Sequence, residues 1–132
     1  MERDDGRIAV FFAIMMPAWL ALMGLLVVGG NRIIALQRAD NVAAEAGRAA
    51  GQAISGPDAI TGGPKVIDPD AAVAAAAAYI VAAGATPQSM VIAADRQHLT
   101  ITVSVTYDPG IFGIFGERWT AEGNANITLI TT

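Results

Sequence analysis

The stretch "IAVFFAIMMPAWLALMGLLVVGG", residues Ile8 to Gly30, is the feature of this 132-residue chain from which its fold follows. It contains 23 consecutive residues without a charge, and eleven of them are Leu, Ile, Phe or Val. A helix of this length spans roughly 34 Å, against a bilayer hydrocarbon core of about 30 Å. At about −0.3 to −0.6 kcal/mol for each strongly apolar residue, membrane insertion is favoured by roughly 3 to 7 kcal/mol. The stretch therefore predicts a single membrane span.

A cleaved secretory signal is the competing interpretation of this segment. Such signals usually have an apolar core of only about 7 to 15 residues, followed directly by a cleavage site of small residues. Here the run is longer and "GGNRII" follows it, which favours a retained span. Pro17 predicts a kink near residues 13–17, because proline removes one helical hydrogen bond.

The charges that flank the span leave its orientation open. The positive-inside rule counts Lys and Arg residues near the two ends of a span. Arg3, Arg7 and the amino terminus lie on one side, and Arg32, Arg38 and Arg48 lie on the other. Charge counting therefore does not choose between the two orientations.

The overall composition fits a membrane protein and argues against some functional classes. Hydrophobic residues make up 54% of the chain and charged residues only 15%, which is more apolar than an ordinary globular domain. The net charge is −4 and the Lys and Arg residues are dispersed, so we expect no nucleic-acid partner. The lack of cysteine excludes disulfides and thiolate metal sites, but it does not fix the compartment.

The helical pattern continues beyond the span as a stalk. Its polar residues recur at spacings of three and four, on one stripe: Arg38, Asn41, Glu45, Arg48 and Gln52. The opposite side is predicted to carry Ile34, Val42, Ala43, Ala46, Ala50 and Ala53. Small residues at these positions allow a sheet or another helix to approach closely. A helix continuous from Ile8 to Ile54 is on the order of 70 Å long.

A loop and a second helix are predicted to follow the stalk. Residues 55–69 are repeatedly interrupted by glycine and proline, which is typical of a loop. The helix has Asp68 as its N-cap, Pro69 in its first position and Gly84 at its exit. Between these ends it is mostly alanine, so its larger side chains are expected to fill the core: Val73, Tyr79, Ile80 and Val81.

The remaining sequence alternates in the manner of strands. "HLTITVSVTY", residues 98–107, places its apolar side chains on one face and its hydroxyl side chains on the other. "SMVIAA" (89–94) and "RWTAEGNANITLI" (118–130) are predicted to form the other two strands. The economical architecture is α+β: a long N-terminal transmembrane and stalk helix, then one helix packed on a three-stranded antiparallel sheet.

Few residues suit catalysis. The single histidine, His98, has no histidine or cysteine partner and begins a predicted strand beside a turn, which favours an ordinary solvated side chain. Asp68 and Asp70 already have a role at a helix start. "TGGPK" lacks the lysine and hydroxyl spacing of a phosphate-binding loop. We therefore expect a non-enzymatic protein without a cofactor or metal.

The segment "GIFGIFGE", residues 110–117, contains two Ile-Phe pairs. If nothing covers them, Ile111, Phe112, Ile114 and Phe115 form an exposed apolar patch and are the candidate contact residues. Three interpretations stay open. The loop dips into the outer membrane face, it contacts a partner subunit, or its phenylalanines fold back to cover the core of the small domain.

The order of these segments resembles the TadE/TadG-like proteins of Tad (Flp-type) pilus systems. The matching stretches are "GRIAVFFAIMMP", "LQRADNVAAEAGRAA" and "LTITVSVTYDPGIFGIFGERWTAEGNANITL", about half of the chain. Proteins of this family look like minor pseudopilins that take part in filament assembly. The resemblance implies a pilin-like fold, a single-pass protein of the cell membrane with a cytoplasmic amino terminus, and an extracytoplasmic αβββ domain at residues 70–132. Residues 7–54 then form the transmembrane helix and stalk.

The resemblance also implies processing and partners. Some members are cleaved by a prepilin peptidase after a glycine, which places cleavage here between Gly6 and Arg7 and makes residues 1–6 a short leader. The family motif usually has Glu at the fifth residue after the cleavage point, commonly within "AVEFA", whereas "AVFFA" puts Phe11 there. The implied partners are the lipid bilayer, other pilin-like subunits, Tad assembly platform proteins and a prepilin peptidase.

Two functions from different classes follow. The first is a structural or assembly component of a Tad-type pilus or related secretion apparatus, anchored by its N-terminal helix. The alternative is a single-pass membrane-anchored extracellular binding module, unrelated to pili, that recognises a ligand or surface through the loop at residues 110–117. The chains that co-purify with the protein distinguish the two.

Overall fold

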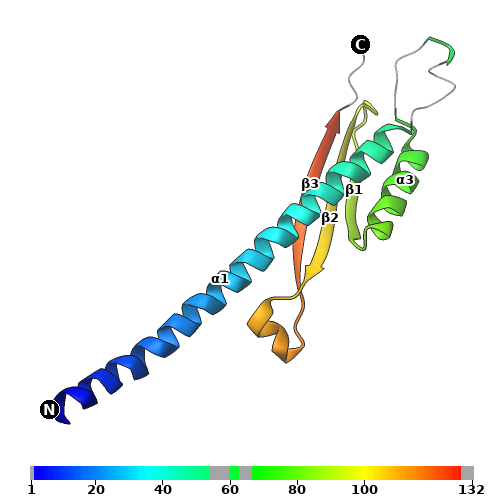
Figure 1. The fold of residues 1–132 in the computed structure, drawn as a ribbon. Coiled ribbons are helices and arrows are strands. Elements are labelled where there is room, and N and C mark those ends of the chain that lie inside the picture. Colours follow the sequence, from blue (N-terminus) through cyan, green and yellow to red (C-terminus); the bar gives the residue numbers. More distant parts are fainter. Residues whose placement is uncertain (1, 54–59, 63–66, 129–132) are drawn as a thin grey trace.

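The computed structural model describes residues 2–53, 60–62 and 67–128. It confirms the α+β arrangement, with a long N-terminal helix, one short helix and a three-stranded antiparallel sheet (Figure 1). The elements in chain order are α1 (Glu2–Gly51), α3 (Pro69–Ala82), β1 (Thr86–Ile92), β2 (His98–Tyr107), the 3-10 helix η1 (Gly110–Phe115) and β3 (Trp119–Thr128).

The long helix α1 is continuous through its residues of low helix propensity. It passes through Pro17 and through glycines 29, 30 and 47. Figure 1 shows its first half projecting away from the other elements and its second half lying along the sheet. The kink at Pro17 stays a prediction. The helix ends at Gly51, three residues before the expected end at Ile54.

The sheet has the strand order β1-β2-β3, with antiparallel pairing throughout. The central strand coincides with the alternating segment from His98 to Tyr107, as predicted. The first strand begins at Thr86 rather than Ser89, because a bulge between Pro87 and Ser89 lets the chain keep pairing past the proline. Leu99, Ile101, Val103 and Val105 are buried, so the apolar face of β2 is also the one expected.

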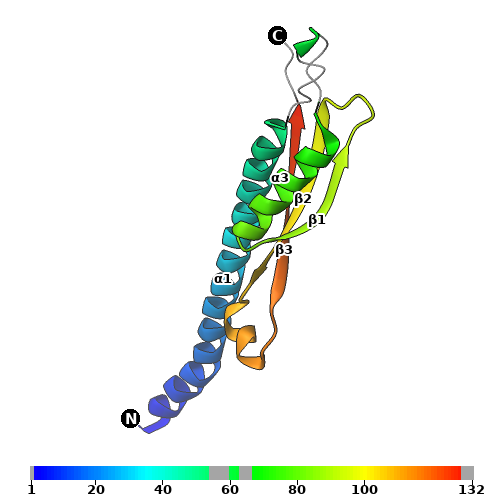
Figure 2. The same cartoon turned by 90° about the vertical axis from the view of Figure 1, so that its right-hand side faces the viewer.

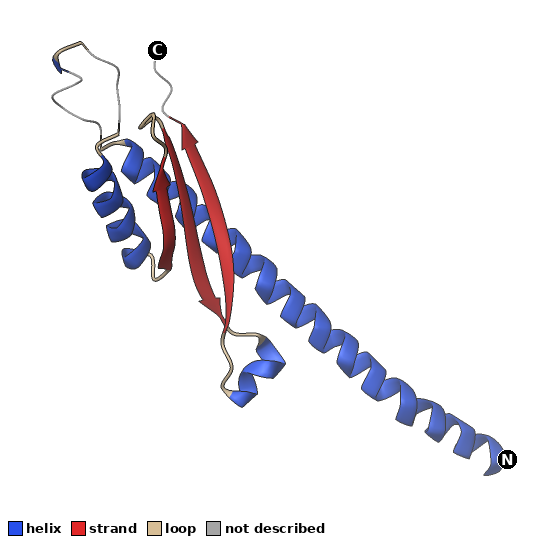
Figure 3. Ribbon diagram, turned by 180° about the vertical axis from the view of Figure 1, so that it is seen from behind, coloured by secondary structure: helices blue, strands red, loops and turns tan. Residues whose placement is uncertain are grey.

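Both helices cover this apolar face, and the other face of the sheet is open (Figures 2 and 3). Threonine and asparagine side chains bridge β2 and β3 on the open face. Thr100 donates to Asn126 and Thr102 to Asn124, over 2.8 and 2.7 Å between side-chain oxygens. A sheet covered on one side only explains why the period-two alternation was so clear in the sequence.

The short helix α3 has the predicted ends but a different core face. Asp68 Oδ1 accepts hydrogen bonds from the backbone N–H groups of Asp70 and Ala71, and Gly84 follows the helix with a left-handed φ of 71°. The buried residues are Ala72, Ala76 and Ile80. The prediction that larger side chains fill the core was wrong for three of them, because α3 lies close enough for alanine to make the contact; these exposed residues are Val73, Tyr79 and Val81.

Part of the expected loop at residues 55–69 belongs to the core. Ile67 is fully buried, and its backbone N–H donates to the carbonyl oxygen of Arg96 over 2.9 Å. The Arg96 side chain returns a hydrogen bond to the Ile67 carbonyl oxygen over 3.1 Å. Ile67 was missed because two adjacent apolar residues, Val66 and Ile67, in a segment interrupted by proline and glycine show no periodicity.

The upper half of α1 packs on the sheet through small residues, as predicted. The buried residues are Ala35, Ala39, Val42, Ala43, Ala46 and Ala50. Ile34, which was expected on this face, is 65% exposed, because the face is rotated by one residue so that Ala35 lies inward. Asp40 also reaches the free edge of β3, where its Oδ1 accepts from the backbone N–H of Asn124 over 3.3 Å. A carboxylate in this position discourages another strand from pairing with the edge.

Candidate functional site

The lower half of α1 is a largely apolar surface that the sheet and α3 do not cover. Every residue from Gly6 to Met23 is exposed, and the most apolar 18-residue window has a mean hydropathy of 2.3. By length and composition α1 is long and apolar enough to cross a membrane, and in the described part of the chain it is the one such helix. Single-pass membrane anchoring is therefore compatible with the fold.

The residues singled out for processing and pairing lie in this lower half. A side chain added at Gly6 would have no neighbour within 4 Å. Phe11 is 58% exposed, and its ring meets that of Phe12 edge to face, with centroids 6.0 Å apart. Gly6, Arg7, Phe11 and Pro17 thus all belong to one exposed stretch of helix, available to lipid or to another chain.

The predicted loop after β2 is a 3-10 helix, η1. Asp108 starts it, because its Oδ1 accepts from the backbone N–H of Gly110 over 2.8 Å. Gly110 and Gly116 have left-handed φ values of 72° and 79° at its two ends, which glycine adopts without steric cost. The glycines that punctuate this segment therefore define a compact turn of helix between β2 and β3.

This turn lies against α1 at the upper end of the apolar stretch (Figures 1 and 2). Asn31 Nδ2 donates to the backbone oxygen of Asp108 over 3.2 Å. A Cβ placed on Gly110 would lie 3.2 Å from Val27 Cγ1, so the two backbones approach closely. Below this contact an apolar cavity of about 320 Å³ is lined by Leu20, Ala21, Gly24, Leu25, Val28 and Phe112.

Aromatic side chains join η1 to the ends of the strands. The ring of Phe112 stacks on Trp119 with centroids 6.0 Å apart, and Trp119 meets Tyr107 edge to face at 6.4 Å. Ile114 and Phe115 are 80% and 81% exposed, and Phe112 is 52% exposed. The interpretation in which these phenylalanines cover the core is therefore wrong. The Ile111 side chain lies outside the described residues.

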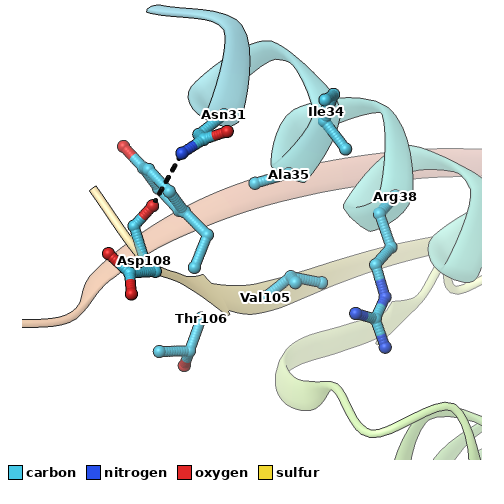
Figure 4. A pocket seen from close by; sticks show the side chains of 8 residues that line it. Asn31, Ile34, Ala35, Arg38, Val105, Thr106 and Asp108 are labelled. Atoms are coloured by element: carbon cyan, nitrogen blue, oxygen red, sulfur yellow. Dashed lines mark hydrogen bonds between the residues drawn. The ribbon is translucent and has the colours of Figure 1, made fainter. Parts of the chain in front are cut away.

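A second, more polar cavity of about 260 Å³ lies above η1, between α1 and the end of β2 (Figure 4). Asn31 points towards Asp108 there, whereas Arg38 extends away from them. The charged groups of this cavity already hold the fold together. Arg38 Nη2 donates to the Ala83 carbonyl oxygen over 3.0 Å, and the Asp108 carboxylate holds the start of η1. The cavity therefore presents a structural hydrogen-bond set rather than a nucleophile and a base.

His98 lies exposed at the turn between β1 and β2, as expected. Its Nδ1 is 2.7 Å from Asp95 Oδ2, and the backbone N–H of Gln97 donates to Asp95 Oδ1 over 3.0 Å. The hydrogen bond from Gln97, followed by that to His98, lowers the pKa of Asp95 below its ordinary value. Among the described residues no three His, Asp or Glu side chains gather as a metal site, and the expectation of a non-enzymatic protein stays a prediction.

The contact between η1 and α1 was missed at the sequence level. Asn31 was the available signal, since it is the first polar side chain after the apolar run, but its partner lies 77 residues away. The stack of Phe112 on Trp119 likewise depends on how η1 folds back between the strands.

Comparisons with models of protein families, with curated proteins and with solved structures find no match to this chain.

Proposed function

We propose that this chain is a non-enzymatic structural or assembly component of a Tad-type pilus or related secretion apparatus, similar to a minor pseudopilin. The observation that carries the proposal is the division of α1 into two halves. From Ile8 to Met23 the helix carries no charge and every residue is exposed, whereas from Ala35 to Ala50 one face is buried under the sheet.

Such a helix suits a subunit that moves between two apolar environments. Its free half lies first in lipid, and the same surface packs against other helices when subunits associate, because close packing replaces lipid contacts at little cost. The domain stays attached as a unit, since the upper half of the helix is part of its core. The amino terminus then lies in the cytoplasm and the domain outside the membrane, as the resemblance implies.

The experiment is purification of the full chain from native membranes under mild detergent, followed by identification of co-purifying chains. We expect other pilin-like subunits and assembly platform proteins. Recovery of the chain alone, as a monomer, would contradict the proposal and support the alternative of an anchored binding module. That alternative has its own observation, the exposure of Ile114 and Phe115.

Amino-terminal sequencing of the same preparation tests the processing step. We expect the mature chain to begin at Arg7. The matched control is Gly6→Val, because the space around Gly6 is open and a larger side chain there disturbs no packing. This variant should keep Met1 and the leader. An intact Met1 in the unaltered protein would contradict cleavage and leave a membrane-resident assembly role.

A further inference from the structure

We propose that η1 is embedded in the lipid bilayer, so that the domain rests on the membrane through Phe112, Ile114 and Phe115 in addition to its anchoring helix. The inference rests on the membrane anchoring contained in the proposed function. The apolar side chains of η1 contact the acyl chains of the leaflet from which α1 emerges. The contact fixes the height and tilt of the domain relative to the bilayer.

The first argument is depth along α1. Phe112 lines a cavity with residues of α1 from Leu20 to Val28. At 1.5 Å per residue these positions lie about 3 to 15 Å below Gly30, the last residue of the charge-free run. A bilayer that covers the run from Ile8 to Gly30 therefore also surrounds η1, which lies beside the same turns of helix in both Figure 1 and Figure 2.

The second argument is that the bilayer has no other place to lie. If its upper boundary were below η1, near Leu20, the span from Ile8 would be only about 18 Å long, against a core of about 30 Å. Moving the boundary down at the other end would bury the charges of the leader and Arg7. An upper boundary near Leu20 would also leave Leu25 and Leu26, which are 69% and 70% exposed, in water.

The third argument is the chemistry of η1 itself. Residues 109–116 contain no charged side chain, and charges return only at Asp108 and Glu117. Trp119 and Tyr107 stand directly above in the ring stack, where amphipathic aromatic side chains favour the membrane interface. The exposed side chains of η1 continue the apolar surface of the span, which favours lipid over a second protein as the occupant.

The test uses the full chain in vesicles of phosphatidylcholine and phosphatidylglycerol that contain lipids spin-labelled on the acyl chain. The chain has no cysteine, so single-cysteine variants need no other change. Ile114→Cys reports on η1, Leu22→Cys on the span, and Glu122→Cys on the exposed face of β3; each carries an environment-sensitive fluorophore. We expect the labels at positions 114 and 22 to be quenched several-fold more than the label at 122.

The outcomes separate this inference from the proposed function. If position 22 is quenched and position 114 is quenched no more than position 122, the embedding of η1 is wrong and the anchoring stands. If neither position 22 nor position 114 is quenched, the anchoring itself is wrong. If position 114 resists lipid quenching and the unlabelled Ile114→Cys variant instead forms disulfide-linked dimers in the vesicles, a second copy covers η1 and the assignment to lipid is overturned.

Discussion

Gly47 of α1 and Gly123 of β3 let the upper half of α1 lie directly on the sheet, because neither has a side chain. A Cβ placed on Gly123 of β3 would overlap backbone atoms of Ala39 and Asp40 in α1, and a Cβ on Gly47 would overlap the side chain of Ile127. A backbone cannot move aside as a flexible side chain can. Gly123 is therefore the residue at which the distance between helix and sheet is set.

Replacing Gly123 tests this contact. Gly123→Ala should lower the free energy of unfolding by about 1–3 kcal/mol, because the added methyl group forces α1 away from β3. The measurement is urea unfolding of the full chain in detergent micelles. Gly30→Ala is the matched control, since the same change in an open position of α1 meets nothing within 4 Å and should not destabilise. Equal stability of both variants would refute the close contact.

Under the proposed function, Phe11 stands at the position where the pilin-like family usually has Glu, and it is exposed in the free half of α1. In the family this glutamate is thought to pair with the charged amino terminus of a neighbouring subunit, which unpaired in the membrane costs about 2.5–3.5 kcal/mol. Phenylalanine cannot form this pair. We therefore expect the unaltered protein to be scarce in filaments sheared from the cell surface and Phe11→Glu to be enriched. Phe12→Glu, one position away on the helix, should not be enriched. Abundant unaltered protein in the filaments contradicts this prediction.

Asp95 makes the turn between β1 and β2 sensitive to acid. Its pKa is lowered in the folded protein, so the carboxylate stabilises the fold above its ordinary value of 3.8 and loses this effect as the pH falls through the lower folded value. Unfolding curves of the unaltered protein and of Asp95→Ala should differ at pH 6 and converge well below pH 3.8. A difference that is unchanged in acid would show that the charge is not responsible.

At the scale of elements, α3 is closed by hydrogen bonds at both of its ends. Asp68 satisfies the first N–H groups. At the other end the N–H of Gly84 bonds to the Val81 carbonyl oxygen, and that of Ala85 to the Ile80 carbonyl oxygen. These two bonds form a Schellman motif. Both ends could be predicted from sequence because capping depends on residues adjacent in the chain.

Removing the cap should weaken α3 measurably. Asp68→Ala should cost about 0.5–2 kcal/mol of unfolding free energy, because two N–H groups lose their acceptor. Asp68→Asn keeps an acceptor oxygen and should restore most of this loss. Thermal unfolding followed by circular dichroism measures both. If the alanine and asparagine variants are equally destabilised, the charge rather than the cap is what matters.

At the scale of the whole molecule, the chain divides at about Asn31. The described buried core begins with Ala35 and ends with Ala121, and the apolar half of α1 contributes nothing to it. The connection across this division is local: Asn31, Gly110 and Phe112 against the last turns of the apolar stretch. The domain should therefore keep its fold without the span.

A fragment of residues 31–132 tests this division. It should fold cooperatively, with an unfolding free energy within about 1 kcal/mol of that of the full chain in detergent, since it loses only surface contacts. A fragment of residues 42–132 is the control, because it also loses the buried Ala35 and Ala39 and the hydrogen bond from Arg38 to Ala83. The control should be clearly less stable. An unfolded 31–132 fragment would show that the span supports the core.

The sequence by itself determined the elements whose signals are local. Apolar length identified the candidate span, capping residues identified both ends of α3, and strict alternation identified β2 and its buried face. The arrangement of these elements relative to one another required the tertiary structure. Alanine rather than Tyr79 faces the core because α3 lies close to its neighbours. The position of η1 beside Leu25 depends on how far β2 runs along α1 before the chain turns. Distances between elements are set by packing across the whole fold, and no short stretch of sequence contains them.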